Sequence, residues 1–445
     1  MKLTNMSKFF LSIFALFISL NFSFAQDGYQ IKVQLDSFQE KQIYLGYHLM
    51  DKQYIQDTVE INKDGFFIFK GDEELVGGVY LLIMPPDNQY FPILISKGEQ
   101  HFTIKANAKN PFKNIEIKGS PDNKLYYDYL TYLSKQIPIK NKLIEAYEKE
   151  GISEADKKAI EKKLEDLDEE VKKYHENLAN NKPKSFSALL AKARSSIVIP
   201  EFKNEASEDD VKMKRYLFYK KHYFDNFKMD DPRLLRSPEL FKRIDYYIQN
   251  LTPQHPDSIN VSLDRIFKLI EGSEETFRYY LSHYLNEYAK SKIVGMDAVY
   301  VHLVENYYAK GRAPWVDEES LKKITDNART LKPILVGKIA PDIKVYKQEK
   351  ETVSLHDIDA KYTIMIFWEP DCGHCKKTMP VLRDLYPKLK KQGVEVLAIC
   401  TKKYDKDKKL AEVEKCWKFL DEHEMTKWIN ATDPFIRSRY AQIYD

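Results

Sequence analysis

Two cysteines separated by two residues, Cys372 and Cys375, have the spacing of a reversible disulfide. They follow the apolar run 363–367, which indicates a buried strand, and precede residues 378–389, whose apolar spacing predicts a helix. The first thiol would therefore lie at a helix N-terminus, where the dipole and free N–H groups favour the attacking thiolate. The second would lie one turn further in, close enough to resolve a mixed disulfide. The pattern predicts exchange chemistry between thiols and disulfides.

The remaining cysteines, Cys400 and Cys416, also lie near the C-terminus of the 445-residue chain. A secreted protein held together by disulfides would spread its cysteines across the domains that need them. Here the thiols are concentrated where the chemistry would be done. For Cys400 and Cys416 we expect buried free thiols, because a thiol packs as a small hydrophobic group, with a disulfide between them as the alternative.

The N-terminus predicts export from the cytoplasm. Lys2 and Lys8 flank a polar start, the apolar run 9–20 follows, and small residues end at Ala25. Residues 1–25 therefore have the pattern of a cleavable signal peptide, too short for a stable membrane span. We expect a mature protein of the periplasm or cell envelope that does not span the membrane. The net charge of +3, with both signs interleaved, argues against nucleic acid as a partner.

Three patterns follow the signal peptide and predict a multidomain α+β protein. Residues 26–120 alternate with period two between turn signals, which predicts a β-sandwich. Residues 121–332 are helical, and Gly151 separates two helices that we expect to form an antiparallel hairpin within this all-α region. Residues 333–445 alternate strands with helices, which predicts an α/β domain. Within that domain, the lysine-rich segment 402–409 indicates a solvated loop.

The C-terminal pattern resembles the TlpA/ResA-like thiol–disulfide oxidoreductases of the thioredoxin superfamily. The likeness rests on residues 337–342, on residues 366–368 and on the Cys-Gly-His-Cys quartet at 372–375, and it covers about the last quarter of the chain. The two preceding regions resemble the accessory domains of exported redoxin proteins of Bacteroidota. The resemblance implies a thioredoxin-like fold for residues 333–445.

The resemblance also implies roles for the quartet. Cys372 matches the attacking thiol of the family and Cys375 the resolving thiol, with Gly373 and His374 between them. A histidine in this place can stabilise the Cys372 thiolate, which favours the reduced form and makes the disulfide more oxidising. The same quartet is similar to that of protein disulfide isomerases, whereas the family usually acts as a reductant. The direction of exchange therefore stays open.

Further supporting residues follow from the family pattern. Trp368 matches the tryptophan that packs beside the motif. Many thioredoxins have a buried acid where this chain has Ile366, so Glu369 becomes the candidate for proton transfer to Cys375. The family continues with a cis-proline loop and further strands, and the sequence ends at Asp445 before that loop. We therefore expect an incomplete thioredoxin-like domain.

The predicted function is an exported thiol–disulfide oxidoreductase that acts on protein thiols and disulfides, with a membrane or periplasmic electron donor and without cofactor or metal. The alternative is a binding or assembly module of the envelope whose cysteines are structural. Zinc would need four ligands, and the quartet has no second close pair of cysteines. Peroxide reduction is a weaker reading, since no cysteine has the position of a peroxidatic thiol.

Overall fold

The computed structural model describes residues 28–202, 207–349, 351–407 and 410–444. The predicted signal peptide lies outside these residues. The chain divides into two compact units. The first holds the chain up to Gln254 together with Val261–Tyr279, and the second holds His255–Asn260 together with the chain from Tyr280 onward.

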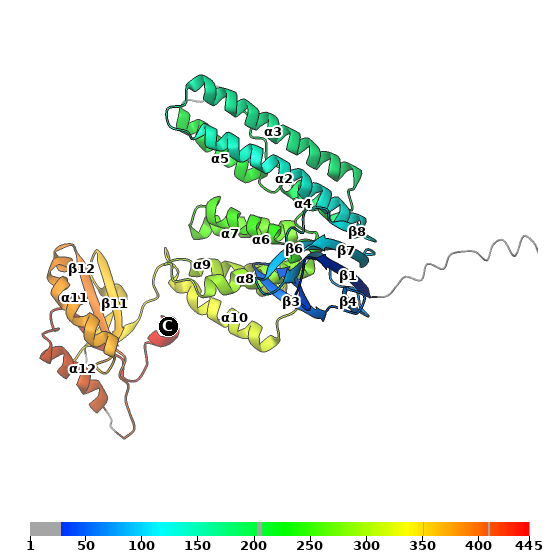
Figure 1. Ribbon diagram of the computed structural model, residues 1–445. Coiled ribbons are helices and arrows are strands. Elements are labelled where there is room, and N and C mark those ends of the chain that lie inside the picture. The colour runs from blue at the N-terminus through cyan, green and yellow to red at the C-terminus, as the bar shows by residue number, and fades with distance from the viewer. Residues whose placement is uncertain (1–27, 203–206, 350, 408–409, 445) are drawn as a thin grey trace, which may run out of the picture. The chain divides into compact units, whose positions relative to one another are not determined.

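The first unit begins with two four-stranded sheets, which form the predicted β-sandwich (Figure 1). One sheet has the order β4-β1-β7-β8 and the other the order β3-β2-β5-β6. Alternate residues of β1 are buried, among them Ile31 and Val33, because period-two patterns place apolar side chains on one face. The strands are β1 (Tyr29–Asp36), β2 (Gln42–Leu49), β3 (Lys52–Glu60), β4 (Phe67–Gly71), β5 (Gly78–Met84), β6 (Gln89–Ile95), β7 (His101–Asn107) and β8 (Glu116–Lys118).

A helical region follows the sandwich. Helices α2 and α3 lie side by side as the predicted antiparallel hairpin (Figure 1). Each starts at a serine, Ser120 or Ser153, whose hydroxyl accepts a backbone N–H of the first turn. The helices are α2 (Pro121–Tyr147), α3 (Glu154–Asn181), α4 (Phe186–Ala193), α5 (Glu208–His222), η1 (Pro232–Arg236), α6 (Pro238–Asn250), α7 (Pro256–Ile270), α8 (Glu274–Ala289), α9 (Asp297–Leu303), η2 (Val304–Tyr308), α10 (Glu318–Leu331) and η3 (Lys332–Ile334).

The C-terminal part of the second unit is an α/β domain with a five-stranded sheet of order β10-β9-β13-β12-β11. Strands β11, β12 and β13 are parallel, and β9 runs antiparallel to β13. The elements are β9 (Lys344–Tyr346), β10 (Thr352–Ser354), η4 (Leu355–Asp357), β11 (Tyr362–Trp368), α11 (Gly373–Lys391), β12 (Val394–Cys400), α12 (Ala411–Glu422), β13 (Ile429–Thr432) and α13 (Tyr440–Ile443).

Strand β12 is the centre of this domain, because all seven of its residues are buried. Val396, Ala398 and Cys400 face a core formed with α11 and α12. Leu397 and Ile399 face a second core on the other side, which includes residues of α13. Strand β12 is therefore covered on both faces, as is usual for strands of parallel sheets.

The mixed α+β class is thus confirmed, with β sheets first, helices in the middle and a thioredoxin-like α/β region last. Strand β13 was not predicted individually within the α/β pattern of residues 333–445. Within the described residues, no helix combines the length and apolar character needed to cross a membrane.

Candidate functional site

The Cys-Gly-His-Cys quartet lies at the turn between β11 and α11. Cys372 is the N-cap residue of α11, and its Sγ accepts the backbone N–H of Cys375 at 3.4 Å. The Cys372 N–H in turn donates to the Glu369 carbonyl at 3.2 Å, which closes the turn after the strand. The sulfur thus lies at the positive end of the helix dipole, beside backbone N–H groups of the first turn. This position stabilises a thiolate.

The two thiols are free, and their surroundings shift their pKa values in opposite directions. Hydrogen bonds from the Cys375 thiol and backbone N–H lower the pKa of Cys372. Burial raises the pKa of Cys375, and its hydrogen bond to Cys372 raises it further. Because the thiolate is the nucleophile, Cys372 is suited to attack while Cys375 stays protonated until it is needed. The order of action that the resemblance implies stays a prediction.

Trp368 is the last residue of β11 and is 2 % exposed. Its ring centroid lies 5.5 Å from that of Phe419, and the apolar core that contains both includes Met379 of α11. Cys375 packs against this same core. The tryptophan therefore lies beneath the quartet and supports the first turn of α11.

Glu369, the candidate proton carrier, has its carboxylate held by the segment that follows β12. The Thr401 hydroxyl donates to Glu369 Oε1 at 2.6 Å. Lys402 Nζ lies 3.4 Å from Glu369 Oε2 and 3.0 Å from an oxygen of Asp371. The negative charge of Glu369 acts to raise the pKa of Cys372, so Lys402 offsets a charge that would disfavour the thiolate.

His374 and Gly373 form the exposed side of the quartet. His374 lies in the first turn of α11 with its side chain exposed. A Cβ built on Gly373 would meet no atom within 4 Å apart from its chain neighbours and the backbone of its own helix, so open space lies beside Gly373.

Cys400 and Cys416 form a disulfide between the end of β12 and the middle of α12. The expectation of two free thiols was therefore wrong, and the alternative disulfide is present. Cys400 is the parallel-sheet partner of Trp368. Because this pair forms the disulfide, the two thiols are not available as zinc ligands for the quartet.

Three family models match the chain. Residues 336–430 match the AhpC/TSA family, residues 29–126 match a domain of unknown function (DUF4369), and residues 180–332 match another domain of unknown function (DUF5106). The first match includes the whole quartet, β11, α11 and β12.

Curated relatives match a shorter segment. The chain is 39% identical over 64 residues to thiol-disulfide oxidoreductase ResA of Bacillus anthracis, which is 14% of this chain and 37% of that protein. It is 38% identical over 68 residues to ResA of Oceanobacillus iheyensis, 14% of this chain and 35% of that protein. These matches support the resemblance of the C-terminal domain to the TlpA/ResA-like proteins of the thioredoxin superfamily. The chain spans just over a third of the length of these relatives.

Solved structures similar to the chain include a domain of a possible thiol-disulfide isomerase from Cytophaga hutchinsonii. It is 30% identical, with a TM-score of 0.22, and the match covers 25% of this chain and 71% of that one. A thioredoxin-like protein from Bacteroides caccae is 20% identical, with a TM-score of 0.39, over 56% of this chain and 87% of that one.

Sequence reasoning missed one residue of the thioredoxin-like domain that contacts the motif. Lys402 was expected in a solvated loop, but its side chain is 19 % exposed and pairs with Glu369 and Asp371. The signal that could have found it is its position two residues after β12. In parallel sheets, the segments that follow neighbouring strands meet at one edge, and the quartet follows β11 at that edge.

Proposed function

We propose that the protein is an exported thiol–disulfide oxidoreductase that exchanges disulfides with protein substrates through Cys372 and Cys375. The observation that supports it most is the asymmetry of the two thiols. Cys372 caps a helix, is partly exposed and has a lowered pKa, whereas Cys375 lies deeper with a raised pKa. The ResA relatives are named thiol-disulfide oxidoreductases, which is the same activity.

The reaction proceeds in two exchanges. The Cys372 thiolate attacks one sulfur of a substrate disulfide, so that a mixed disulfide forms and the other substrate sulfur leaves as a thiolate and takes up a proton. Cys375 then loses its proton and attacks the Cys372 sulfur, which releases the second substrate thiolate and forms the Cys372–Cys375 disulfide. The substrate gains two electrons and the domain loses two. Glu369 is proposed to carry the Cys375 proton.

A complete cycle needs an electron donor, which we propose is a membrane or periplasmic dithiol protein. Periplasmic placement follows from the signal-peptide pattern of residues 1–25. In this proposal, residues 333–445 perform the exchange, and residues 26–120 and 121–332 are accessory domains.

The reduction potential of the Cys372–Cys375 pair separates exchange from a structural role. We expect a value in the range of catalytic pairs, about −120 to −270 mV. The full chain would be equilibrated with dithiol buffers, alkylated and digested, and the peptide that carries both cysteines quantified by mass spectrometry. A value below about −300 mV would instead support the alternative of a binding module with structural cysteines. Because only the peptide that carries Cys372 and Cys375 is quantified, the Cys400–Cys416 disulfide does not contribute to the measured potential.

His374→Ala should make the pair more reducing. Loss of the imidazole removes a group that stabilises the Cys372 thiolate, so the reduced form loses stability. We expect a potential more negative by about 10–30 mV, up to a tenfold change in the equilibrium constant. Alkylation of Cys372 should also need a higher pH.

The matched control is His356→Ala. His356 is another exposed histidine of the same domain, in η4 after β10, at the sheet edge opposite β11. Its replacement should leave the potential unchanged. Equal shifts in the two variants, or none in His374→Ala, would refute the role of His374.

A further inference from the structure

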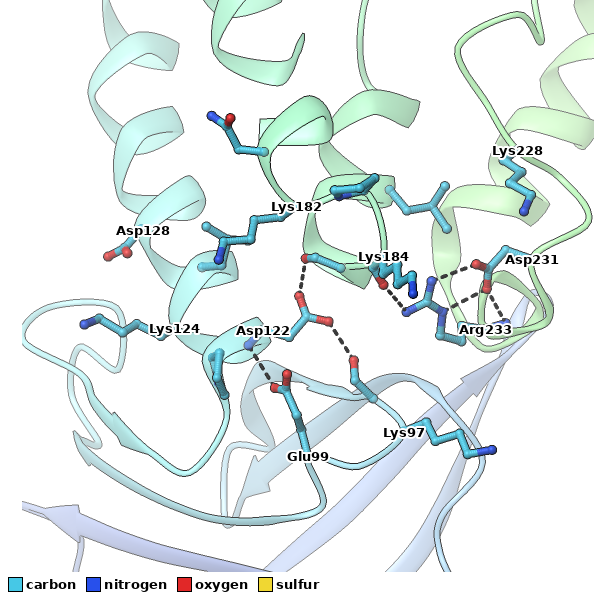
Figure 2. A pocket seen from close by; sticks show the side chains of 17 residues that line it. Lys97, Glu99, Asp122, Lys124, Asp128, Lys182, Lys184, Lys228, Asp231 and Arg233 are labelled. Atoms are coloured by element: carbon cyan, nitrogen blue, oxygen red, sulfur yellow. Dashed lines mark hydrogen bonds and ion pairs between the residues drawn. The ribbon is translucent and has the colours of Figure 1, made fainter. Parts of the chain in front are cut away.

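A cavity of about 950 Å³ opens in the first unit, which contains no cysteine (Figure 2). Four segments line it: the turn after β6, the start of α2, the connection from α3 to α4, and the segment that leads into η1. Its volume is at the upper end of the range for sites that bind small molecules or short peptide segments. None of the chemistry proposed for the quartet uses this cavity.

Lysines dominate the rim of the cavity. Five of them contribute, and all are exposed: Lys97, Lys124, Lys182, Lys184 and Lys228. Across the described parts of the chain, no carboxylate forms an ion pair with any of these five. Figure 2 shows Lys184 and Lys228 near Arg233, at one end of the cavity, while Lys182 extends toward Asp128 at the other. Unpaired positive charge therefore lies at both ends.

The carboxylates of the cavity do not balance this charge, because most are already bound. Asp122 is buried and accepts hydrogen bonds from hydroxyl and backbone groups. Glu99 accepts from the Ser120 hydroxyl at 2.8 Å and from the Asp122 N–H at 2.9 Å. Asp231 forms a two-point pair with Arg233, with distances of 2.7 and 2.9 Å. Of the four acidic residues that line the cavity, Asp128 is therefore the one whose charge is left to balance the lysines.

The lining also includes apolar side chains. Leu125 and Leu189 are partly exposed, and Pro121 and Pro183 add rings that carry no N–H donor. An inorganic anion would gain nothing from these side chains. A ligand that carries both carboxylates and apolar groups would contact the lysines as well as this apolar part of the lining.

We propose that this cavity binds an extended acidic peptide segment of a partner or substrate protein. Separated lysines are flexible point charges, which suit carboxylates spaced along a chain better than one bidentate phosphate. The uncompensated positive charge would also attract an acidic segment from solution. Peptide binding in this cavity does not depend on the thiol chemistry, so this proposal is tested independently of the proposed oxidoreductase activity.

The test is fluorescence anisotropy of a fluorescein-labelled hexapeptide of alternating glutamate and leucine, titrated with the full chain at low salt. We expect saturable binding that weakens as salt rises. The double variant Lys184→Glu/Lys228→Glu should weaken binding about tenfold or more. The matched control is Lys41→Glu/Lys63→Glu, which changes net charge equally at exposed lysines of the sandwich outside the cavity, and it should bind as the unaltered chain does.

Several results would overturn the proposal. Equal loss in the control pair would mean that net charge alone drives binding. A peptide with glutamine in place of glutamate that binds as tightly would remove the charge argument. Displacement by inorganic phosphate or free glutamate at low millimolar concentration would indicate a site for small anions. A circular dichroism melt of each variant confirms that it is folded.

Discussion

Replacing Cys372 with serine should abolish disulfide exchange, whereas Cys375→Ser should react once and remain bound to its substrate. Cys372 is the partly exposed N-cap residue whose pKa is lowered, so it alone is ready to attack. A serine hydroxyl stays protonated at neutral pH and cannot replace it. We expect exchange to fall about a thousandfold or more, as when a nucleophile is removed from an enzyme.

The contrast between the two variants tests the assigned order of action. Without Cys375 the mixed disulfide on Cys372 cannot be resolved, so a protein disulfide incubated with Cys375→Ser should yield a covalent adduct on a non-reducing gel. Cys372→Ser should yield none. If Cys372→Ser still exchanges disulfides, or if adducts form through Cys375, the assignment is wrong.

The second pair of cysteines provides the control. Cys400 and Cys416 are joined in a disulfide, with Cys416 fully buried and Cys400 nearly so. The double variant Cys400→Ala/Cys416→Ala should therefore still exchange disulfides and still form no adduct. Any loss should be limited to the stability of the domain, since a disulfide constrains the unfolded chain.

Local patterns were enough to find the redox turn. The β-branched run before Trp368 and the apolar spacing after Cys375 are properties of neighbouring residues, so strand, turn and helix followed from the sequence. The alternation of β1 predicted a strand in the same way.

Contacts between distant segments could not be predicted in this way. Lys402 pairs with Glu369 and Asp371, which lie more than thirty positions earlier, and a lysine-rich stretch by itself indicates only solvation. The choice between free thiols and a disulfide depended on whether α12 brings Cys416 to the end of β12, and no local pattern determines that packing. Strand β13 is short and has mixed polarity, so its sequence does not distinguish it from a loop.

Asp122 is the second residue whose replacement should have a large effect, in this case on stability. It lies in the first turn of α2, is 5 % exposed, and accepts hydrogen bonds from three serine hydroxyls and two backbone N–H groups. The donors belong to Ser96 at the end of β6 and to Ser185, Phe186 and Ser187 at the start of α4. One carboxylate thus joins the sandwich, α2 and α4.

Asp122→Ala should lower the free energy of unfolding of the first unit by about 3–4 kcal/mol, because several buried donors lose their acceptor at once. Asp122→Asn keeps an oxygen acceptor but removes the charge, so it should lower the free energy of unfolding by less than Asp122→Ala does. Asp128→Asn, on an exposed carboxylate of the same helix, is the matched control and should be neutral. Urea unfolding followed by far-ultraviolet circular dichroism measures all three.

The same carboxylate should make stability depend on pH in a defined direction. Burial acts to raise the pKa of Asp122, but hydrogen bonds from Ser185, Ser187 and Ser96 outweigh it, so the pKa lies below its ordinary value. A group whose pKa is lowered by folding stabilises the fold fully above its unfolded value, about pH 4, and loses that contribution as the pH falls further. The gap in stability between the unaltered protein and Asp122→Asn should therefore be constant at neutral pH and narrow below about pH 4. A gap that widens on acidification would show that the buried carboxylate is not held by its charge-assisted hydrogen bonds.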